Sequence, residues 1–190
     1  MDTKKIEQAV TDFLIAIGED PTRPGLIETP DRVARMCQEI FEGINYTNEE
    51  IANMFNKTFD ITENKNDMVL IKDIDVFSYC EHHLALMYDM KVSVAYIPNK
   101  KVLGLSKVAR IADMAAKRLQ LQEKLGNDIA EIISLASDSK DVAVMIKGCH
   151  SCMSARGIKK ANATTITTTY TGKFKEDINL QNKFLANLAL

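Results

Sequence analysis

The residues best suited to chemistry lie in two short segments rich in cysteine and histidine. Residues 80–83 read Cys-Glu-His-His, and residues 149–152 read Cys-His-Ser-Cys. Together the segments hold all three histidines and three of the four cysteines, and only Cys37 lies elsewhere. Thiolates and imidazoles are ligands that Zn²⁺ prefers, but neither segment alone holds enough of them for a tetrahedral site. We therefore expect the fold to bring the two segments together around one metal ion.

Two kinds of zinc site are compatible with this spacing. Three cysteines and one histidine would make a closed structural site. If instead the second segment continues a strand from Val142, His150 and Cys152 share one face of that strand and Cys149 points to the other. The ion would then keep an open position for water, whose pKa a catalytic zinc lowers to about 7. His82 and His150 would be free for proton transfer.

Two groups of basic residues could hold an anion. Lys107 and Arg110 follow Ser106 at an expected helix start, and Arg156 lies shortly after the second segment. Either group in isolation is more typical of a solvated surface, but a helix N-terminus with Lys and Arg nearby suits a phosphate chain. Their combination with a metal-type segment favours a phosphorylated substrate. Residues 120–123, Gln-Leu-Gln-Glu, could bind the donor edge of a base such as guanine or could form an exposed helix surface.

The composition excludes several classes of protein. The chain has 190 residues, 46% of them hydrophobic and 26% charged, with a formal net charge of −2. It lacks the basic character expected of a protein that binds nucleic acid or an anionic membrane. Its N-terminus is amphipathic rather than a signal peptide, and no apolar run reaches transmembrane length. The cysteine usage favours reduced thiols in the cytoplasm, and the Cys-x-x-Cys at 149–152 lacks the βαβ context of a redox motif.

The first third of the chain is predicted to be helical. Apolar residues recur at helical spacing up to residue 17, and Gly18 ends the run. A second helix is expected with Thr29 as N-cap and Pro30 in its first position. Residues 47–50, Thr-Asn-Glu-Glu, match a capping box, so a short helix should follow and reach residue 55.

The rest of the chain is predicted to be an antiparallel sheet interrupted by helices. Strands are expected at residues 68–76, 86–97, 142–146 and 163–170. Ser106 is expected to cap a helical pair that runs to residue 135 with a break near Leu119, and a last helix should cover residues 177–190. This order indicates the α+β class. We expect one domain over residues 1–190, with a helical part at 1–56 and an α+β core at 57–190.

Five segments in one order resemble the GTP cyclohydrolase I family. They are residues 29–34, 80–83, 104–110, 120–123 and 150–157, and the resemblance extends from Gly18 to the C-terminus. It implies a zinc enzyme that converts GTP and water to 7,8-dihydroneopterin triphosphate and formate, in tetrahydrofolate and pteridine biosynthesis. It also implies the tunnelling fold, in which a helical pair packs on an antiparallel sheet behind an N-terminal helical extension. The family assembles as a toroid, typically a homodecamer, with sites at subunit interfaces.

The resemblance also implies a role for individual residues. It assigns zinc to Cys80, His83 and Cys152, leaves Cys149 without a role, and makes His82 and His150 the catalytic pair, with Ser106 assisting ribose opening. The substrate contacts that it implies are Gln122 and Glu123 on the guanine ring, Lys107, Arg110 and Arg156 on the triphosphate, and Arg32 reaching a site from a neighbouring subunit. Two alternatives remain at this point: a structural-zinc interaction module, and a relative of the same fold with altered chemistry.

Overall fold

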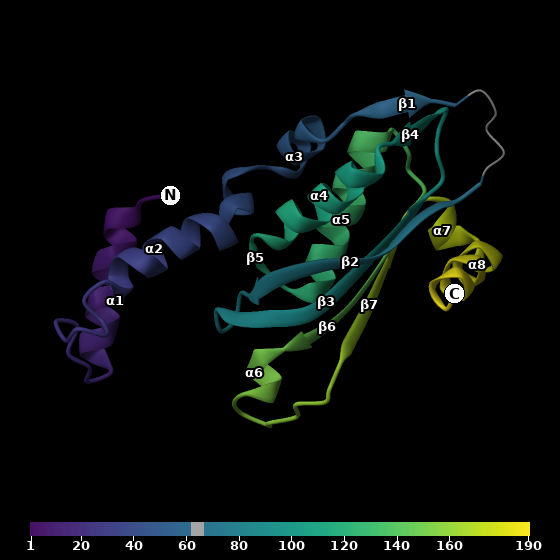
Figure 1. Ribbon diagram of the computed structural model, residues 1–190. Coiled ribbons are helices and arrows are strands. Elements are labelled where there is room, and N and C mark those ends of the chain that lie inside the picture. Colours follow the sequence, from purple (N-terminus) through teal and green to yellow (C-terminus); the bar gives the residue numbers. More distant parts are fainter. Residues whose placement is uncertain (62–66) are drawn as a thin grey trace.

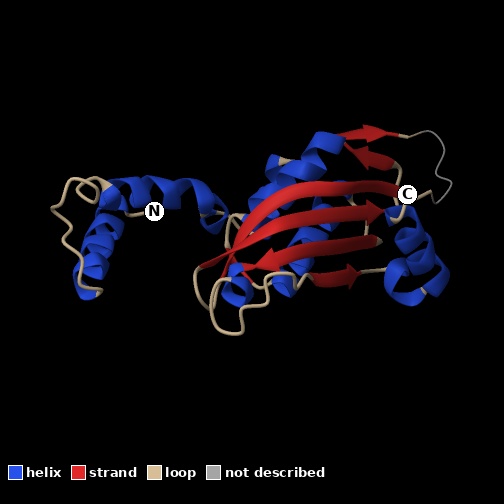
Figure 2. Ribbon diagram, turned by 60° about the horizontal axis from the view of Figure 1, so that its bottom comes forward, coloured by secondary structure: helices blue, strands red, loops and turns tan. Residues whose placement is uncertain are grey.

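The protein has an α+β fold built on one sheet. The computed structural model describes residues 1–61 and 67–190. A five-stranded sheet with helices packed on it forms the core, and two N-terminal helices extend away from this core (Figures 1 and 2). The predicted class, an antiparallel sheet carrying a helical pair behind an N-terminal helical extension, is confirmed.

The sheet consists of four long or medium strands and one very short one. Their order is β5-β2-β3-β6-β7, formed by β2 (Val69–Cys80), β3 (Ala85–Tyr96), β5 (Leu119–Gln120), β6 (Val142–His150) and β7 (Thr165–Tyr170). The pairs β2–β3, β3–β6 and β6–β7 are antiparallel, as predicted. The break expected near Leu119 is itself a strand, β5, which pairs parallel with the end of β2.

Two long helices cover one face of the sheet. Helix α4 (Leu105–Ala116) and helix α5 (Gln122–Ser137) bury their apolar residues against the inward side chains of the strands, and together they form the main core. The expected apolar face of α4, which includes Val108 and Ile111, is fully buried. The predicted cap is wrong: Gly104 is the N-cap, and Ser106 lies inside the first turn.

The last two helices pack on the opposite face of the sheet. Helices α7 (Lys173–Glu176) and α8 (Ile178–Leu188) bury Phe174 and Phe184 in a second, smaller core with alanines of β3 and β6. Successive residues of a strand point to opposite faces, so one strand can serve both cores. The predicted C-terminal helix is confirmed, with Asp177 as its N-cap accepting hydrogen bonds from two backbone amides.

The N-terminal part is helical, as predicted. Helix α1 (Thr3–Ala16) and helix α2 (Thr29–Ile40) form a hairpin, and a 3₁₀ turn η1 (Glu42–Asn45) leads to helix α3 (Asn48–Met54). The capping box that begins with Thr47 is confirmed, with both of its hydrogen bonds present. The expected cap at Thr29 is off by one residue, because the N-cap is Glu28 and its side chain makes no capping bond.

Two short strands lie apart from the main sheet. Strands β1 (Thr58–Asp60) and β4 (Lys101–Leu103) pair antiparallel, and the sequence analysis predicted neither of them. None of the helices in the described residues is both long and apolar enough to span a membrane.

Candidate active site and metal centre

Three side chains from the two Cys/His segments converge at one end of the sheet. Cys80 is the last residue of β2, His83 lies in the turn that follows, and Cys152 belongs to the short helix α6 (Ser151–Ser154). One ligand atom from each residue lies within 4.8 Å of the other two. Cys80 is buried, Cys152 is half-buried and His83 is exposed, so the cluster is open to solvent on one side.

Cys149 lies outside this cluster, but for a different reason from the one expected. Strand β6 ends at His150, and Cys152 lies on a helix rather than on the same strand face as His150. The expectation that a continuous strand carries both His150 and Cys152 is therefore wrong. The predicted result, that the Cys149 and Cys152 side chains point to different surroundings, is present. The Cys149 sulfur lies 4.0 Å from the Thr164 hydroxyl. Within the described residues, the cluster thus offers three ligands rather than four.

Backbone pairing fixes the first segment. Cys80 is in register with Ala85 of β3 on one side and with Gln120 of β5 on the other. The Glu81 amide donates to the Gln120 carbonyl at 3.1 Å, and the Leu84 amide donates to the Cys80 carbonyl at 2.9 Å. Both edges of the strand end are therefore held, and the tight turn presents His82 and His83 at the surface.

Ser151 fixes the second segment to the first. Its hydroxyl donates to the Leu86 carbonyl at 2.7 Å, which joins the start of α6 to β3. This hydrogen bond links the turn region of β3 to the helix that carries Cys152. The sequence analysis missed Ser151, and its position inside the Cys-His-Ser-Cys segment was the available signal.

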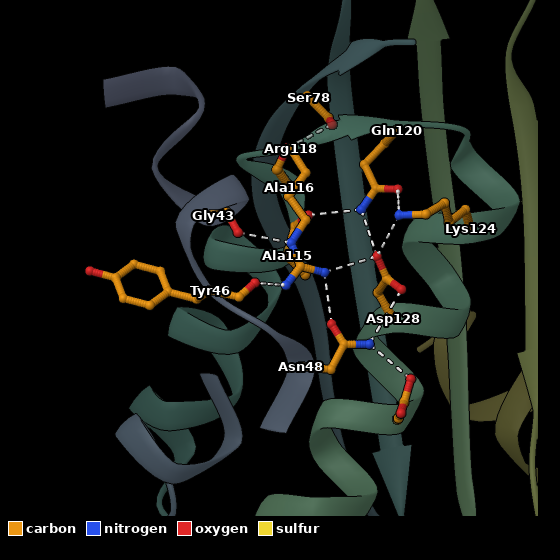
Figure 3. A network of polar contacts seen from close by, with 11 residues as sticks. Gly43, Tyr46, Asn48, Ser78, Ala115, Ala116, Arg118, Gln120, Lys124 and Asp128 are labelled. Carbon is orange, nitrogen blue, oxygen red and sulfur yellow. Dashed lines mark hydrogen bonds and ion pairs between the residues drawn. The ribbon is translucent and has the colours of Figure 1, made fainter. Parts of the chain in front are cut away.

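A polar network behind β5 supports the same strand end (Figure 3). Arg118 donates to Asp128 at 3.1 Å and to Asn48 at 2.7 Å, and its guanidinium also donates to the Gly43 and Tyr46 carbonyls. The Gln120 amide donates to Asp128 at 2.9 Å. Arg118 and Asp128 are almost entirely buried, with 12% and 13% of their side chains exposed. The network therefore connects the segment before α3 to the strand that pairs with Cys80.

His150 lies beside the cluster and against α5. Its Nε2 is 2.9 Å from the side-chain oxygen of Gln122, which is itself only 2% exposed. Burial lowers the pKa of His150, and the nearby Glu123 carboxylate opposes this shift by raising it. Glu123 is the second residue of α5, so the helix start places both predicted base-contacting residues next to His150.

Arg156 reaches the cluster from the loop after α6. Its guanidinium lies 3.1 Å from the Nε2 of His83. Burial raises the pKa of the Cys152 thiol, and the neighbouring Cys80 raises it further. The Cys152 thiol, with a second thiol and an imidazole beside it, belongs to a donor set that a bound divalent cation would stabilise in the deprotonated form.

The remaining predicted anion contacts lie elsewhere in the same chain. Ser106, Lys107 and Arg110 occupy the first half of α4, whose opposite end is tied to β2 by a 2.7 Å hydrogen bond from Ser78 to the Ala116 carbonyl. Ser106 is about 15 Å along the helix axis from Ala116, at 1.5 Å per residue. Arg32 lies on α2, outside the core, and forms an ion pair with Glu28. Within one chain, Ser106 therefore lies at the end of α4 away from the Ser78 contact, and Arg110 lies about 9 Å along the axis from Ala116.

Comparisons with known proteins agree with the constellation around Cys80. The family model for GTP cyclohydrolase I matches residues 6–189. A GTP cyclohydrolase 1 of Ruminiclostridium cellulolyticum is 61% identical over 97% of this chain and 97% of its own length. One of Clostridium acetobutylicum is 58% identical over 98% and 97%.

Among solved structures, the archaeosine synthase QueF-Like in the apo form is similar over 55% of this chain and 93% of its own, with 24% identity and a TM-score of 0.45. The full-length match and the two relatives, taken with the Cys80, His83 and Cys152 cluster beside His150, lead to one conclusion. The chain belongs to the GTP cyclohydrolase I family and is a hydrolase with the activity that defines this family.

Proposed function

We propose that the enzyme holds Zn²⁺ through Cys80, His83 and Cys152 and uses it to hydrolyse the purine ring of GTP, with 7,8-dihydroneopterin triphosphate and formate as products. The single observation that carries this proposal is the convergence of two thiols and one imidazole within 4.8 Å. Two sulfur ligands and one nitrogen ligand suit zinc better than Mg²⁺ or Ca²⁺, which prefer oxygen. Three protein ligands are the number found in catalytic zinc sites, where zinc supplies Lewis acidity and activates water.

Two histidines that are not ligands handle the protons in this proposal. His82 shares a turn with the ligand His83, and their rings meet edge to face with centroids 6.3 Å apart. His150 ends β6, two residues before the ligand Cys152. Both rings therefore lie beside the reacting centre, where one can take a proton and the other can deliver one. Ring opening requires both transfers, because water loses protons as the purine nitrogens gain them.

The substrate would lie between the metal-side residues and a set of cations. We assign the guanine ring to the α5 start, where Glu123 supplies a carboxylate and Gln122 was predicted as a second contact. The triphosphate would be bound by Arg156, which already lies at the cluster, and by Lys107 and Arg110. Ser106 would assist ribose opening. Arginine and lysine suit this role because charge-assisted hydrogen bonds to phosphate are strong.

This assignment requires more than one subunit. Because Lys107 and Arg110 lie on a different part of the fold from the Cys80 cluster, we propose that they and Arg32 serve the metal centre of a neighbouring chain. The N-terminal hairpin also carries large apolar side chains that are more than half exposed, as an interface would require: Phe13, Ile15, Ile17 and Ile27. A toroidal homodecamer with sites at its subunit interfaces is the assembly that we propose.

We further propose that residues 1–190 act as one catalytic domain in the cytoplasm. The proposed ligand set supports this location, because Cys80 and Cys152 must stay reduced to bind a metal ion. Neither nucleic acid nor a membrane is expected as a partner.

The direct test is turnover of GTP by protein of defined metal content. Zinc-loaded protein should release formate and a product with pterin fluorescence after oxidation, and chelator-treated protein should regain this activity with Zn²⁺ but not with Mg²⁺. His150→Ala should keep its zinc and lose most of its turnover. If the chelated protein stays fully active, the zinc proposal is wrong; if His150→Ala stays fully active, the proposed role of His150 is wrong.

A further inference from the structure

We infer that Gln122 is a positioning residue, whose buried side-chain amide fixes the orientation of His150 and holds its proton on Nε2. The kinetic consequence rests on the proposed catalytic role of His150. The orientation and the tautomer, however, are properties of the protein alone and can be measured without turnover. Gln122 is a residue that the family resemblance assigns to the guanine ring of the substrate.

The direction of the Gln122 amide follows from its partners on two strands. Its Nε2 lies 3.0 Å from the Ile146 carbonyl of β6 and 3.2 Å from the Thr165 carbonyl of β7, and Thr167 offers a hydroxyl at 3.2 Å. Backbone carbonyls can only accept hydrogen bonds. The reversed amide would place the side-chain oxygen against two carbonyl oxygens in a buried site, so the NH₂ group must face the strands.

The tautomer of His150 follows from the direction of the amide. The Gln122 oxygen faces the Nε2 of His150 at 2.9 Å. An amide oxygen can only accept, so Nε2 must carry the hydrogen and donate it. A neutral imidazole carries hydrogen on one ring nitrogen only, which leaves Nδ1 as the nitrogen with a free lone pair. Gln122 therefore makes Nδ1 the atom of His150 that can accept a proton from water or substrate.

A glycine leaves the space that this arrangement needs. Gly148 precedes His150 by two residues on β6, so both residues face the same side of the sheet. A Cβ atom at Gly148 would lie 3.3 Å from the Gln122 oxygen and 3.0 Å from the Met90 Cγ, closer than ordinary contact. A side chain at residue 148 would therefore force the Gln122 amide or the Met90 side chain to shift from this arrangement.

The same contacts argue against Gln122 as a contact for guanine. Its two amide hydrogens already have three acceptors within the protein, and its oxygen already faces His150. A guanine acceptor would have to displace a buried bond of the NH₂ group, which costs roughly 1–3 kcal/mol for a group left unpaired, and a guanine donor would have to share the Gln122 oxygen with His150. Glu123 meets no such obstacle and keeps the base-binding role proposed for it.

Solid-state ¹⁵N NMR on zinc-loaded protein labelled only at histidine tests the inference directly. With the ring neutral, and with His150→Ala identifying the signals, wild-type His150 should show a protonated Nε2 and an unprotonated Nδ1. Gln122→Met should give a mixture of tautomers. Gln120→Met is the matched control, because Gln120 is equally buried but bonds to Ala115 and Asp128, so His150 signals should not change. A wild-type proton on Nδ1 would overturn the inference without any variant.

Steady-state kinetics separates positioning from substrate binding. Gln122→Met should lower kcat by about tenfold to a hundredfold with little change in KM for GTP, because a positioned acid–base group contributes roughly 10²–10⁴-fold. A raised KM with unchanged kcat would instead make Gln122 a base contact and overturn the inference. If His150→Ala itself keeps full turnover, the proposed function of His150 fails, and the NMR measurement still decides the role of Gln122.

Discussion

At the scale of single residues, Cys149 and Cys152 are only three positions apart in the sequence, yet their thiols lie in different surroundings. Cys152 lies on α6 with its sulfur in the cluster of Cys80 and His83. Cys149 lies on β6, where it pairs with Tyr88 of β3 and its sulfur faces Thr164. The change from strand to helix at residue 151 directs the two thiols to different surroundings.

Cys149→Ser should therefore bind one zinc ion per chain and turn over GTP as the wild type does, whereas Cys152→Ser should lose the metal. Removing a ligand from a three-ligand set weakens binding strongly, while replacing a thiol outside the set does not. Elemental analysis after dialysis against a weak chelator measures both variants, and circular dichroism checks that each has folded. Loss of zinc from Cys149→Ser would show a closed four-ligand site.

Residue types and spacing were sufficient to predict that the two Cys/His segments meet around one metal ion, because these ligand types are rare in the chain and occur in two places. They left sets of three and of four ligands open, and the family resemblance selected Cys80, His83 and Cys152. The role of Gln122 could not be predicted in this way. Its environment is created by the pairing of β6 with β7 and by the absence of a side chain at Gly148. The sequence around Gln122 and the sequence around Gly148 do not indicate a contact between Gln122 and His150.

At the scale of elements, the join between the N-terminal arm and the core depends on a close approach of two backbones. Gly43, in η1, lies so near the end of α4 that a Cβ atom would be 2.2 Å from the Met114 carbonyl and 2.9 Å from the Lys117 carbonyl. Arg118 binds the Gly43 carbonyl from the same side at 3.0 Å. The arm is therefore held by contacts that tolerate no added atom.

Gly43→Ala should destabilise the protein by about 1–3 kcal/mol, the usual cost of forcing extra atoms into a packed site. Gly104→Ala is the control, because a Cβ there meets its nearest atoms at an ordinary 3.6 Å and the variant should lose only the smaller preference for glycine over alanine at the α4 N-cap. Urea unfolding of the two variants measures the difference in free energy of unfolding. Equal stability of both variants would mean that the η1–α4 contact can shift at little cost.

The network around Asp128 makes stability depend on pH. Burial acts to raise the pKa of Asp128, but hydrogen bonds from Gln120 and Lys124 and the charge of Lys124 outweigh it, so its pKa is lowered in the folded state. A carboxylate with a lowered folded pKa stabilises the protein above its unfolded pKa, near 3.9, and this contribution is lost as pH falls through the folded pKa.

Asp128→Asn should accordingly be less stable than the wild type at neutral pH, and the difference should shrink as the pH falls below about 4. The free energy of unfolding of both proteins, measured by urea titration across a series of pH values, tests this. A difference that stays constant through the acid range would show that the ionised state of Asp128 contributes nothing.

The starts of the helices could be predicted from the sequence only where a side-chain capping motif was present. Thr47 was predicted correctly because both hydrogen bonds of its capping box form. Thr29 was assigned as a cap from its residue type and from Pro30 after it, and Ser106 from its residue type. The actual caps, Glu28 and Gly104, make no side-chain capping bond. Strand β5 was missed because it has two residues and exists only through its register with the distant Cys80.

At the scale of the whole molecule, the predicted site residues divide into two groups. The metal-side group at the end of the sheet comprises Cys80, His83 and Cys152 with His150 beside them. The cation group lies on the first half of α4, with Arg32 on the arm. A heterologous interface in a ring brings different faces of successive subunits together. The proposed site, composed of residues from two chains, would join these two groups.

Such a site predicts complementation between inactive chains. Cys152→Ser damages only the metal side and Arg110→Ala only the cation side, so each homo-oligomer should have little activity. In a random equal mixture assembled together, about a quarter of the sites should combine two intact halves if each site takes its halves from different subunits of the ring. Co-expression with two tags, tandem purification and a formate-release assay measure this recovery.

The decisive control mixes two defects from the same side, Cys152→Ser with His83→Ala, because these ligands come from one chain and no arrangement restores an intact cluster. Recovery in the first mixture and none in the second would establish that each metal centre uses the α4 cations of another subunit. Co-assembly without recovery in the first mixture would place Arg110 either with its own chain's metal centre or outside the site.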